Sequence, residues 1–287
     1  MRRFSKEWTD HNLRHFGRRA DWVFRLATAS RRVLPDFLII GTMKGGTTSL
    51  YDYLCQHPSV VSAYRKEVHF FDMHYTRGTR WYRANFPTHG ELSMHGRGAV
   101  TGEATPYYLF HPAGPTRLSR LLPEAKLIAV LRNPVDRAVS HYFHSVRTGM
   151  ESRPIEHALR YDQPILKSES AKLMVDGYES DKHRMWSYIA RGHYADQLEA
   201  YLQVYPREQL LVLRSEDLFS VPQSAVDQTT RFLGLEDMRL HHKEVRNEGT
   251  YSKSDDPLSA PLRQQLTDYF RPHNTRLSEL LGQDFVW

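Results

Sequence analysis

Residues 37–49 read FLIIGTMKGGTTS, and this stretch decides the fold. Its first four residues are apolar without interruption, which is typical of a strand covered on both faces in a parallel sheet. A glycine-rich turn follows. Residues 47–56 then read as a helix, because Leu50 and Leu54 stand four positions apart. The stretch therefore predicts a strand, a tight loop and a helix in succession.

The same order of elements recurs later in the chain. Apolar runs cover residues 127–131 and 210–213, and each precedes a segment with helical features. The helix predicted for residues 134–147 opens on a proline. The helix predicted for residues 220–233 is followed by Gly234, a residue typical of helix ends.

Repeated strand–helix units predict an α/β fold of three layers, in which helices cover both faces of a central parallel sheet. A weaker strand is predicted at residues 100–103, and residues 148–181 are predicted to form a loop with short helices. Ligands bind such sheets at the carboxyl ends of the strands. The loops that follow the strands are therefore expected to form the functional site.

The 287 residues have a formal net charge of +6, and this excess is local. Residues 1–35 hold nine basic and three acidic side chains, so residues 36–287 have no net charge. We expect a basic N-terminal arm or helix followed by one domain over residues 36–287. The arm could contact an anionic surface. Alternatively it is a solvated helix beside the domain, with Trp22, Phe24 and Leu26 partly buried.

Composition excludes several classes of protein. With 40% hydrophobic and 25% charged residues, the chain is globular rather than disordered. The longest apolar run is residues 127–131, far short of the ~20 residues that span a bilayer, and residues 1–35 lack the apolar core of a secretion signal. The single Cys55 cannot form an internal disulfide. A cytoplasmic location without nucleic acid partners is expected, and the oligomeric state stays open.

The loop after the first strand has the composition of a phosphate cradle. Glycines let the backbone approach an anion, and the first amides of a helix point their positive end at it. Lysine adds charge and hydroxyls add donors. The lysine precedes the glycine pair here, whereas the standard nucleoside-triphosphate loop places it after the last glycine, so a nucleotide kinase is the less favoured alternative. The predicted anion-binding residues are Lys44, Gly45, Gly46, Thr47, Thr48 and Ser49.

Four segments in order extend this pattern into a resemblance. Residues 44–48 resemble the 5′-phosphosulfate loop of sulfotransferases that use 3′-phosphoadenosine 5′-phosphosulfate (PAPS), above all the heparan sulfate sulfotransferases and their bacterial relatives. The other segments are residues 66–72 (KEVHFFD), 131–140 (LRNPVDRAVS) and 269–282. The resemblance implies the P-loop-like sulfotransferase fold, and transfer of a sulfuryl group from PAPS to an acceptor hydroxyl or amine.

The resemblance assigns the 3′-phosphate of PAPS to Arg132 and Ser140. A guanidinium can hold a phosphate with paired donors, and a hydroxyl adds a further contact. The alternative is that Arg132 pairs with Asp136 and that Ser140 is an ordinary helix residue. A looser match near the C-terminus implies that Tyr251 and Lys253 lie on a loop that closes over the nucleotide.

Glu67 is the predicted general base. Sulfuryl transfer needs the acceptor to lose its proton as it attacks sulfur, and a positioned carboxylate contributes ~10²–10⁴ in rate. The resemblance gives Glu67 this role; by itself, a glutamate beside a lysine is usually a solvated ion pair. Lys44 is predicted to stabilise charge on the leaving phosphate oxygen. His69, also a predicted catalytic residue, and Asp72 would contact the acceptor or orient the base, unless His69 is an ordinary structural histidine.

Two histidines suggest a metal site, because His141 and His144 stand three apart on a predicted helix. No carboxylate or cysteine completes a recognisable ligand set. The reaction that the resemblance implies needs no metal, and none is predicted.

The chain departs from the glycosaminoglycan enzymes at Ala104, where they carry a lysine suited to a sulfated or carboxylated sugar. Animal Golgi members also have a membrane anchor and usually a disulfide, and neither is found in this sequence. Both differences favour a soluble enzyme of bacterial type. The expected acceptor is a carbohydrate hydroxyl, followed by a hydroxyl of a lipid or another small molecule. A non-catalytic anion-binding module that works through the basic arm is a further alternative.

Overall fold

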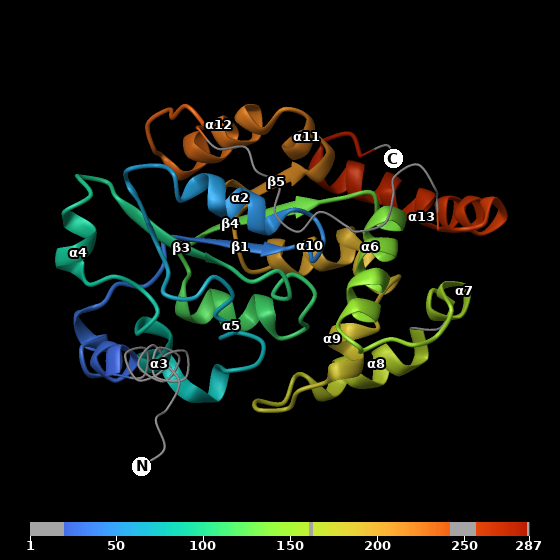
Figure 1. Cartoon of the computed structure of the whole chain (residues 1–287), viewed down its shortest axis with the longest axis horizontal. Coiled ribbons are helices and arrows are strands. Elements are labelled where there is room, and N and C mark those ends of the chain that lie inside the picture. Colours follow the sequence, from blue (N-terminus) through green and yellow to red (C-terminus); the bar gives the residue numbers. More distant parts are fainter. Residues whose placement is uncertain (1–19, 161–162, 242–256, 286) are drawn as a thin grey trace, which may run out of the picture.

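A five-stranded parallel sheet forms the centre of the computed structural model, which describes residues 20–160, 163–241, 257–285 and 287 (Figure 1). The strand order is β2-β3-β1-β4-β5, and each neighbouring pair runs parallel. The strands are β1 (Phe37–Gly41), β2 (Val60–Ser62), β3 (Val100–Ala104), β4 (Lys126–Leu131) and β5 (Leu210–Arg214).

Helices cover both faces of this sheet and make three layers. On one face, α2 (Thr47–Leu54) and α12 (Pro222–Leu233) pack on Ile39 and Val130. On the other face, α5 (Gly114–Leu121) and α10 (Tyr194–Leu202) pack on Leu38. The predicted three-layer α/β class is therefore confirmed, and successive residues of β1 enter opposite cores, as a strand buried on both faces requires.

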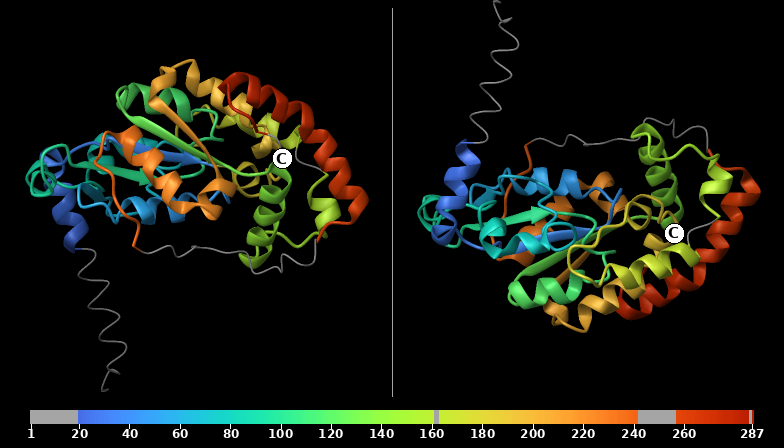
Figure 2. Two further views of the ribbon diagram at one scale, coloured as in Figure 1. Left: turned by 90° about the horizontal axis from the view of Figure 1, so that it is seen from above. Right: turned by 90° about the horizontal axis from the view of Figure 1, so that it is seen from below.

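Two helices extend the molecule beyond the carboxyl ends of the strands. α6 (Pro134–Arg147) has the predicted bounds, and Asn133 caps it by accepting hydrogen bonds from the amides of Val135 and Asp136. α13 (Ala260–Leu281) packs against α6 and α10, and Gly282 ends it in a left-handed conformation. Figure 2 shows α13 and the helical residues 20–27 at opposite ends of the molecule.

The shorter elements differ in part from the predictions. β2 was not predicted, because three residues at the sheet edge are too few to show a pattern. The helix predicted for residues 220–233 begins two residues later and follows a separate short helix. The short elements are η1 (Ala29–Arg31), η2 (Tyr75–Arg77), α3 (Gly78–Arg83), α4 (His89–Ser93), α7 (Ile155–Ala158), α8 (Gln163–Lys172), α9 (Asp181–Met185), η3 (Ala190–Gly192), η4 (Arg207–Gln209) and α11 (Ser215–Ser220).

Helical residues 20–27 pack against the body of the molecule. Trp22 and Leu26 are partly buried against the core, whereas Phe24 is 62% exposed. Trp22 and Leu26 stand four apart and share one helix face, and Phe24 lies on the opposite face. Arg25 donates hydrogen bonds to the carbonyls of Ala84 and Phe86. None of the helices in the described part of the chain is long and apolar enough to cross a membrane.

Candidate active site

The loop between β1 and α2 folds tightly over the end of the neighbouring strand. Gly45 lies so close to β4 that a Cβ atom placed there would be 2.3 Å from the carbonyl oxygen of Val130. Gly46 has φ of 101° and Lys44 has φ of 70°, so both are left-handed. A side chain at position 45 would therefore push the loop away from the sheet, and at position 46 glycine supplies the backbone freedom.

Lys44 brings an uncompensated positive charge to this loop. Among the described residues, no carboxylate lies within ion-pair distance of its ammonium. Burial, together with the charges of Arg147 and Arg132, lowers the pKa of Lys44 to about 8. A bound anion would relieve each of these unfavourable contributions.

The predicted 3′-phosphate residues lie beside the same loop. The guanidinium of Arg132 donates a hydrogen bond to the backbone carbonyl of Lys44 over 3.4 Å. Asp136 pairs with Arg263 at 2.9 Å, so it is not committed to Arg132 as the alternative interpretation supposed. Ser140 is buried on α6. The loops after β1 and β4 thus meet, as parallel neighbouring strands require.

Arg147 belongs to this cluster of cations and was not predicted. It donates a hydrogen bond to Nδ1 of His144 over 3.1 Å, and its charge contributes to the low pKa of Lys44. A sequence signal exists for it: Arg147 follows Ser140 by seven residues, close to two helical turns, and so shares its face of α6.

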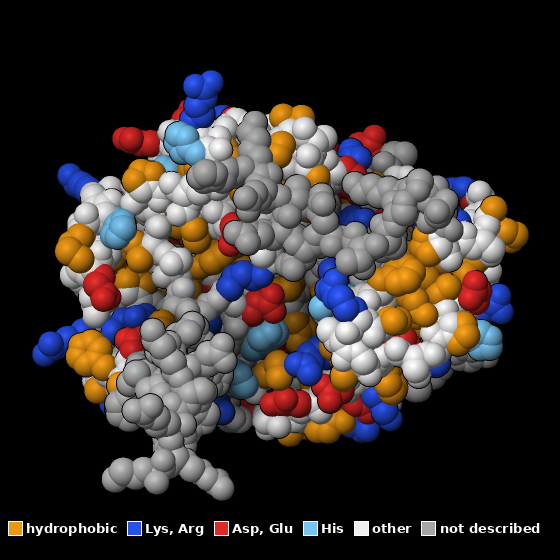
Figure 3. Space-filling model, viewed as in Figure 1, with side chains coloured by type: hydrophobic (Ala, Val, Ile, Leu, Met, Phe, Trp, Pro, Cys, Tyr) orange, Lys and Arg blue, Asp and Glu red, His pale blue; other side chains and the backbone are white. Residues whose placement is uncertain are grey.

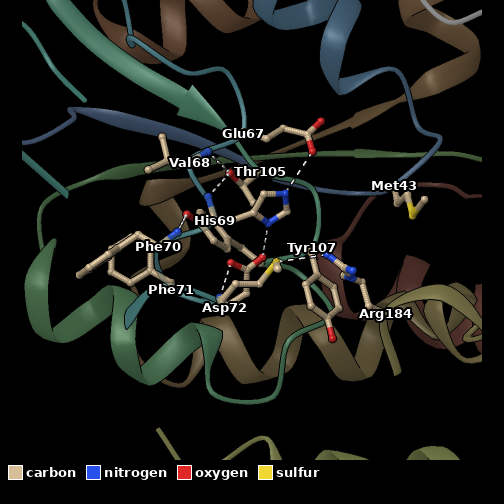
Figure 4. A network of polar contacts seen from close by, with 12 residues as sticks. Met43, Glu67, Val68, His69, Phe70, Phe71, Asp72, Thr105, Tyr107 and Arg184 are labelled. Atoms are coloured by element: carbon tan, nitrogen blue, oxygen red, sulfur yellow. Dashed lines mark hydrogen bonds and ion pairs between the residues drawn. The ribbon is translucent and has the colours of Figure 1, made fainter. Parts of the chain in front are cut away.

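Glu67, His69 and Asp72 form one chain of contacts between β2 and α3 (Figure 4). Nδ1 of His69 lies 2.7 Å from Oδ2 of Asp72, and Nε2 of the same ring lies 3.3 Å from Oε2 of Glu67. Asp72 is buried and accepts a hydrogen bond from the amide of Met73, whereas the side chain of Glu67 is 41% exposed. The chain therefore runs from a buried carboxylate, through an imidazole, to a carboxylate that solvent can reach.

The charges of this chain support one another. Burial opposes the charge of His69, but hydrogen bonds to Asp72 and Glu67 outweigh it and raise the pKa of His69 to about 10. Burial also acts against ionisation of Glu67, but His69 and Lys66 outweigh it and lower the pKa of Glu67. At neutral pH, Glu67 is a carboxylate that can accept a proton, and His69 is an imidazolium that orients it.

Lys66 connects this chain of contacts to the start of α2, directly after the loop that follows β1. Its ammonium donates a hydrogen bond of 2.5 Å to the hydroxyl of Thr48, and it lies 3.4 Å from Oε1 of Glu67. The ammonium of Lys66 therefore lies between the candidate base, Glu67, and the loop that is predicted to bind the anion. On the face shown in Figure 3, basic, acidic and histidine side chains meet near the centre.

The remaining predicted site residues are placed as follows. Thr47 is buried at the start of α2, and Ser49 is fully buried two residues further along the helix. Tyr251 and Lys253 lie outside the described residues. His141 is fully buried, which lowers its pKa well below the usual value. In residues 20–160, 163–241 and 257–285, no group of three or more His, Cys, Asp or Glu side chains could hold a metal ion.

A comparison with protein families identifies the chain. The model of the sulfotransferase domain family matches residues 34–255. The chain belongs to the sulfotransferase family. The family predicted from the four ordered segments is thereby confirmed.

Relatives of this sulfotransferase are found in animals, amoebae and bacteria. It is 31% identical over 279 residues to mouse heparan sulfate glucosamine 3-O-sulfotransferase 3B1. The match covers 90% of this chain and 66% of the relative. It is 27% identical over 320 residues to membrane-associated sulfotransferase kil1 of Dictyostelium discoideum, covering 88% and 66%. The chain thus spans just under two thirds of the length of these relatives.

A solved structure supports the fold as well as the family. The crystal structure of a sulfotransferase from Alicyclobacillus acidocaldarius superposes with a TM-score of 0.66 at 31% sequence identity. The match covers 88% of this chain and 98% of that chain. The nucleotide kinase alternative is not favoured by any of these matches.

Proposed function

We propose that this sulfotransferase transfers the sulfuryl group of PAPS to a carbohydrate hydroxyl. The observation that carries the proposal is the position of Lys66, which contacts Thr48 of the anion loop and Glu67 of the base segment at once. An ionised carboxylate beside an anion cradle suits a reaction that removes a proton while an anion leaves.

The residues of the loop suit an anionic co-substrate. Gly45 lets the loop lie close to β4, Gly46 supplies its left-handed turn, and the start of α2 would direct its positive end at a bound anion. Lys44 would hold the 5′ side, and Arg132 with Ser140 the 3′-phosphate. When bound, PAPS supplies the sulfuryl group and leaves as adenosine 3′,5′-bisphosphate (PAP).

The chain itself supplies a base and a charge. Glu67 accepts the proton of the attacking hydroxyl at a carboxylate oxygen, while the imidazolium of His69 keeps that carboxylate in place. Lys44, with the cations of Arg132 and Arg147 close by, stabilises the negative charge that grows on the leaving phosphate. Glu67, His69 and Lys44 are each in the protonation state that the role requires at neutral pH.

The carbohydrate acceptor is supported by the relatives. Two mouse relatives at 31% identity are named as heparan sulfate glucosamine 3-O-sulfotransferases, which favours a sugar hydroxyl over an amine. Ala104 is uncharged and fully buried, so it offers no substitute for the lysine of the glycosaminoglycan enzymes. A less highly charged glycan is therefore a reasonable first acceptor.

The test is a transfer assay with sulfur-labelled PAPS and a panel of glycans, glycolipids and hydroxylated small molecules, with products identified by mass spectrometry. We expect label on at least one carbohydrate with the native enzyme, and a loss of at least ~10²-fold with Glu67→Gln. If only lipids or small molecules are labelled, the proposed carbohydrate acceptor is wrong and the labelled class takes its place. Consumption of ATP with no transfer from PAPS would overturn the reaction type.

The cytoplasmic location, the contact of the basic arm with an anionic surface and the domain start at residue 36 stay predictions. Sedimentation of the purified protein with vesicles of anionic lipid, and with vesicles of neutral lipid as the control, tests the arm directly.

A further inference from the structure

The backbone of the segment that carries Glu67 and His69 is fixed by hydrogen bonds to side chains. The amide of Val68 donates to the hydroxyl of Thr105 over 3.1 Å, and the amide of His69 donates to the same oxygen over 3.4 Å. The amide of Phe70 donates to the hydroxyl of Tyr108 over 2.8 Å. Three consecutive amides therefore donate to side-chain hydroxyl groups rather than to the backbone of a strand or helix.

The support matters because His69 has an unusual backbone. Its φ is 54°, in the left-handed region that residues other than glycine seldom adopt. Such a conformation persists where surrounding contacts determine it. Thr105 is itself fixed, because its amide donates to the carbonyl of Ile39 in β1.

Both hydroxyls are oriented by one carboxylate, that of Glu103 at the end of β3. Glu103 is fully buried, and its Oε2 accepts from Thr105 over 2.6 Å and from the amide of Val68 over 3.2 Å. Its Oε1 accepts from Tyr82 over 2.7 Å and from Tyr108 over 3.1 Å. Four donors converge on a group that in its ionised form can only accept.

Burial raises the pKa of Glu103 to about 7, and the ionised form of this carboxyl dictates where the hydroxyl protons lie. Each hydroxyl has one proton, and in Thr105 and Tyr108 that proton points at Glu103. Their lone pairs are consequently free to receive the amides of His69 and Phe70. A neutral amide at position 103 would replace one of the two acceptor oxygens by an NH2 donor, so that either Thr105 or Tyr108 would lose its acceptor.

We propose that Glu103 is a positioning residue of the sulfotransferase: it orients the hydroxyls of Thr105 and Tyr108, which hold the backbone of the Glu67–His69 segment in its catalytic geometry. The role rests on the proposed function of Glu67. Its structural basis, the geometry around His69, can be measured without any acceptor.

Two tyrosines offer a matched pair of variants. Tyr82 and Tyr108 are both fully buried and both donate to Oε1 of Glu103, but only Tyr108 receives an amide of the segment. We expect Tyr108→Phe to lower kcat ~10- to 100-fold, because small displacements of reacting groups have effects of that size. Tyr82→Phe should lower kcat by no more than about threefold, and neither variant should change the Kd of PAP by more than about threefold.

The decisive readout is the pKa of the His69 imidazole, followed by NMR on histidine-labelled enzyme and assigned with His69→Asn. We expect Tyr108→Phe and Glu103→Gln to lower this pKa toward the ordinary value of about 6.5, because the contacts with Asp72 and Glu67 loosen. Tyr82→Phe should leave it unchanged. Equal effects of the two tyrosine variants on both the pKa and kcat would overturn the proposal.

Thr105 supplies a second pair in case Tyr108→Phe does not fold. Thr105→Ser keeps the hydroxyl and should retain the native pKa of His69, whereas Thr105→Val removes it and should not. A native pKa in folded Thr105→Val would overturn the proposal. If the pKa effects appear but the native enzyme transfers no label from PAPS, the positioning network stands and the proposed function fails.

Discussion

Opposite charges in the loops that follow β1 and β2 are the chemical basis of the site at the residue scale. Lys44 is a cation whose charge is opposed by its surroundings, and Glu67 is an anion whose charge is supported by them. The first is suited to receive an anionic ligand, and the second is suited to receive a proton without first losing one. These two states lead to separate predictions.

Lys44 predicts a pH dependence of cofactor binding. Its pKa in the free enzyme is about 8 and rises when an anion binds, so the affinity for PAP is constant below about pH 8 and falls as pH rises through it. Lys44→Met should raise the Kd of PAP by about 10- to 100-fold, as expected for the loss of one charged hydrogen bond. Calorimetry between pH 7 and pH 9.5 measures both effects. If the Kd of PAP had the same pH dependence in the native enzyme and in Lys44→Met, Lys44 would not be the titrating group.

Glu67→Gln separates chemistry from binding. The variant keeps the size of the side chain but removes the proton acceptor, so kcat should fall by ~10²–10⁴ while the Kd of PAP changes little. Single-turnover transfer from labelled PAPS measures the first quantity, and calorimetry measures the second. Glu67 would be excluded as the base by a variant with native kcat.

At the scale of elements, the conformation of the loop after β1 depends on the close contact between Gly45 and β4. Gly45→Ala would place a Cβ atom 2.3 Å from the carbonyl oxygen of Val130, so the loop must move away from the sheet. We expect a loss of stability of about 1–3 kcal/mol, typical of overpacking, and at least a tenfold rise in the Kd of PAP.

Gly90→Ala is the control for this glycine variant. Gly90 lies in α4, and the nearest atom to its added Cβ would be the Thr88 hydroxyl at 4.0 Å. Alanine favours a helix by about 0.5–1 kcal/mol over glycine, so the control should lose neither stability nor affinity. Urea denaturation and calorimetry on both variants test the contrast, and equal behaviour would show that the contact with Val130 is unimportant.

Elements with a strong local pattern could be predicted, and those without one could not. The apolar runs predicted β1, β4 and β5, whereas the three-residue β2 carries no periodicity. In the site, Lys44 and Glu67 stood out through their neighbours in sequence. Glu103 did not, because its donors come from α3, from the loop before α3 and from the loop after β3, and only the folded chain brings them together.

On the scale of the whole molecule, part of the basic excess of residues 1–35 belongs to a segment that packs on the body. Residues 20–35 are attached to the body, since Trp22 stacks on Tyr64 with ring centroids 5.7 Å apart and Arg25 donates to two carbonyls. Part of the positive charge that the sequence analysis assigned to an N-terminal arm therefore belongs to a helix that packs on the domain, as Arg25 shows. The neutral remainder carries the site.

Truncation tests this division. Removal of residues 1–30 eliminates Trp22 and the hydrogen bonds of Arg25, and should lower the free energy of unfolding by about 3 kcal/mol or more. Removal of residues 1–19 leaves these contacts in place and is the matched control. Denaturant titrations measure both values. Equal losses would contradict a structural role for residues 20–30.

We infer that the cluster around Lys44, Arg132 and Ser140 binds a 3′-phosphorylated adenosine nucleotide. Calorimetric titration of the purified protein with PAP, and with ATP as the comparison, tests it most directly. We expect tight binding of PAP, much weaker binding of ATP, and loss of this preference in Arg132→Ala. Tight binding of ATP together with no binding of PAP would contradict it.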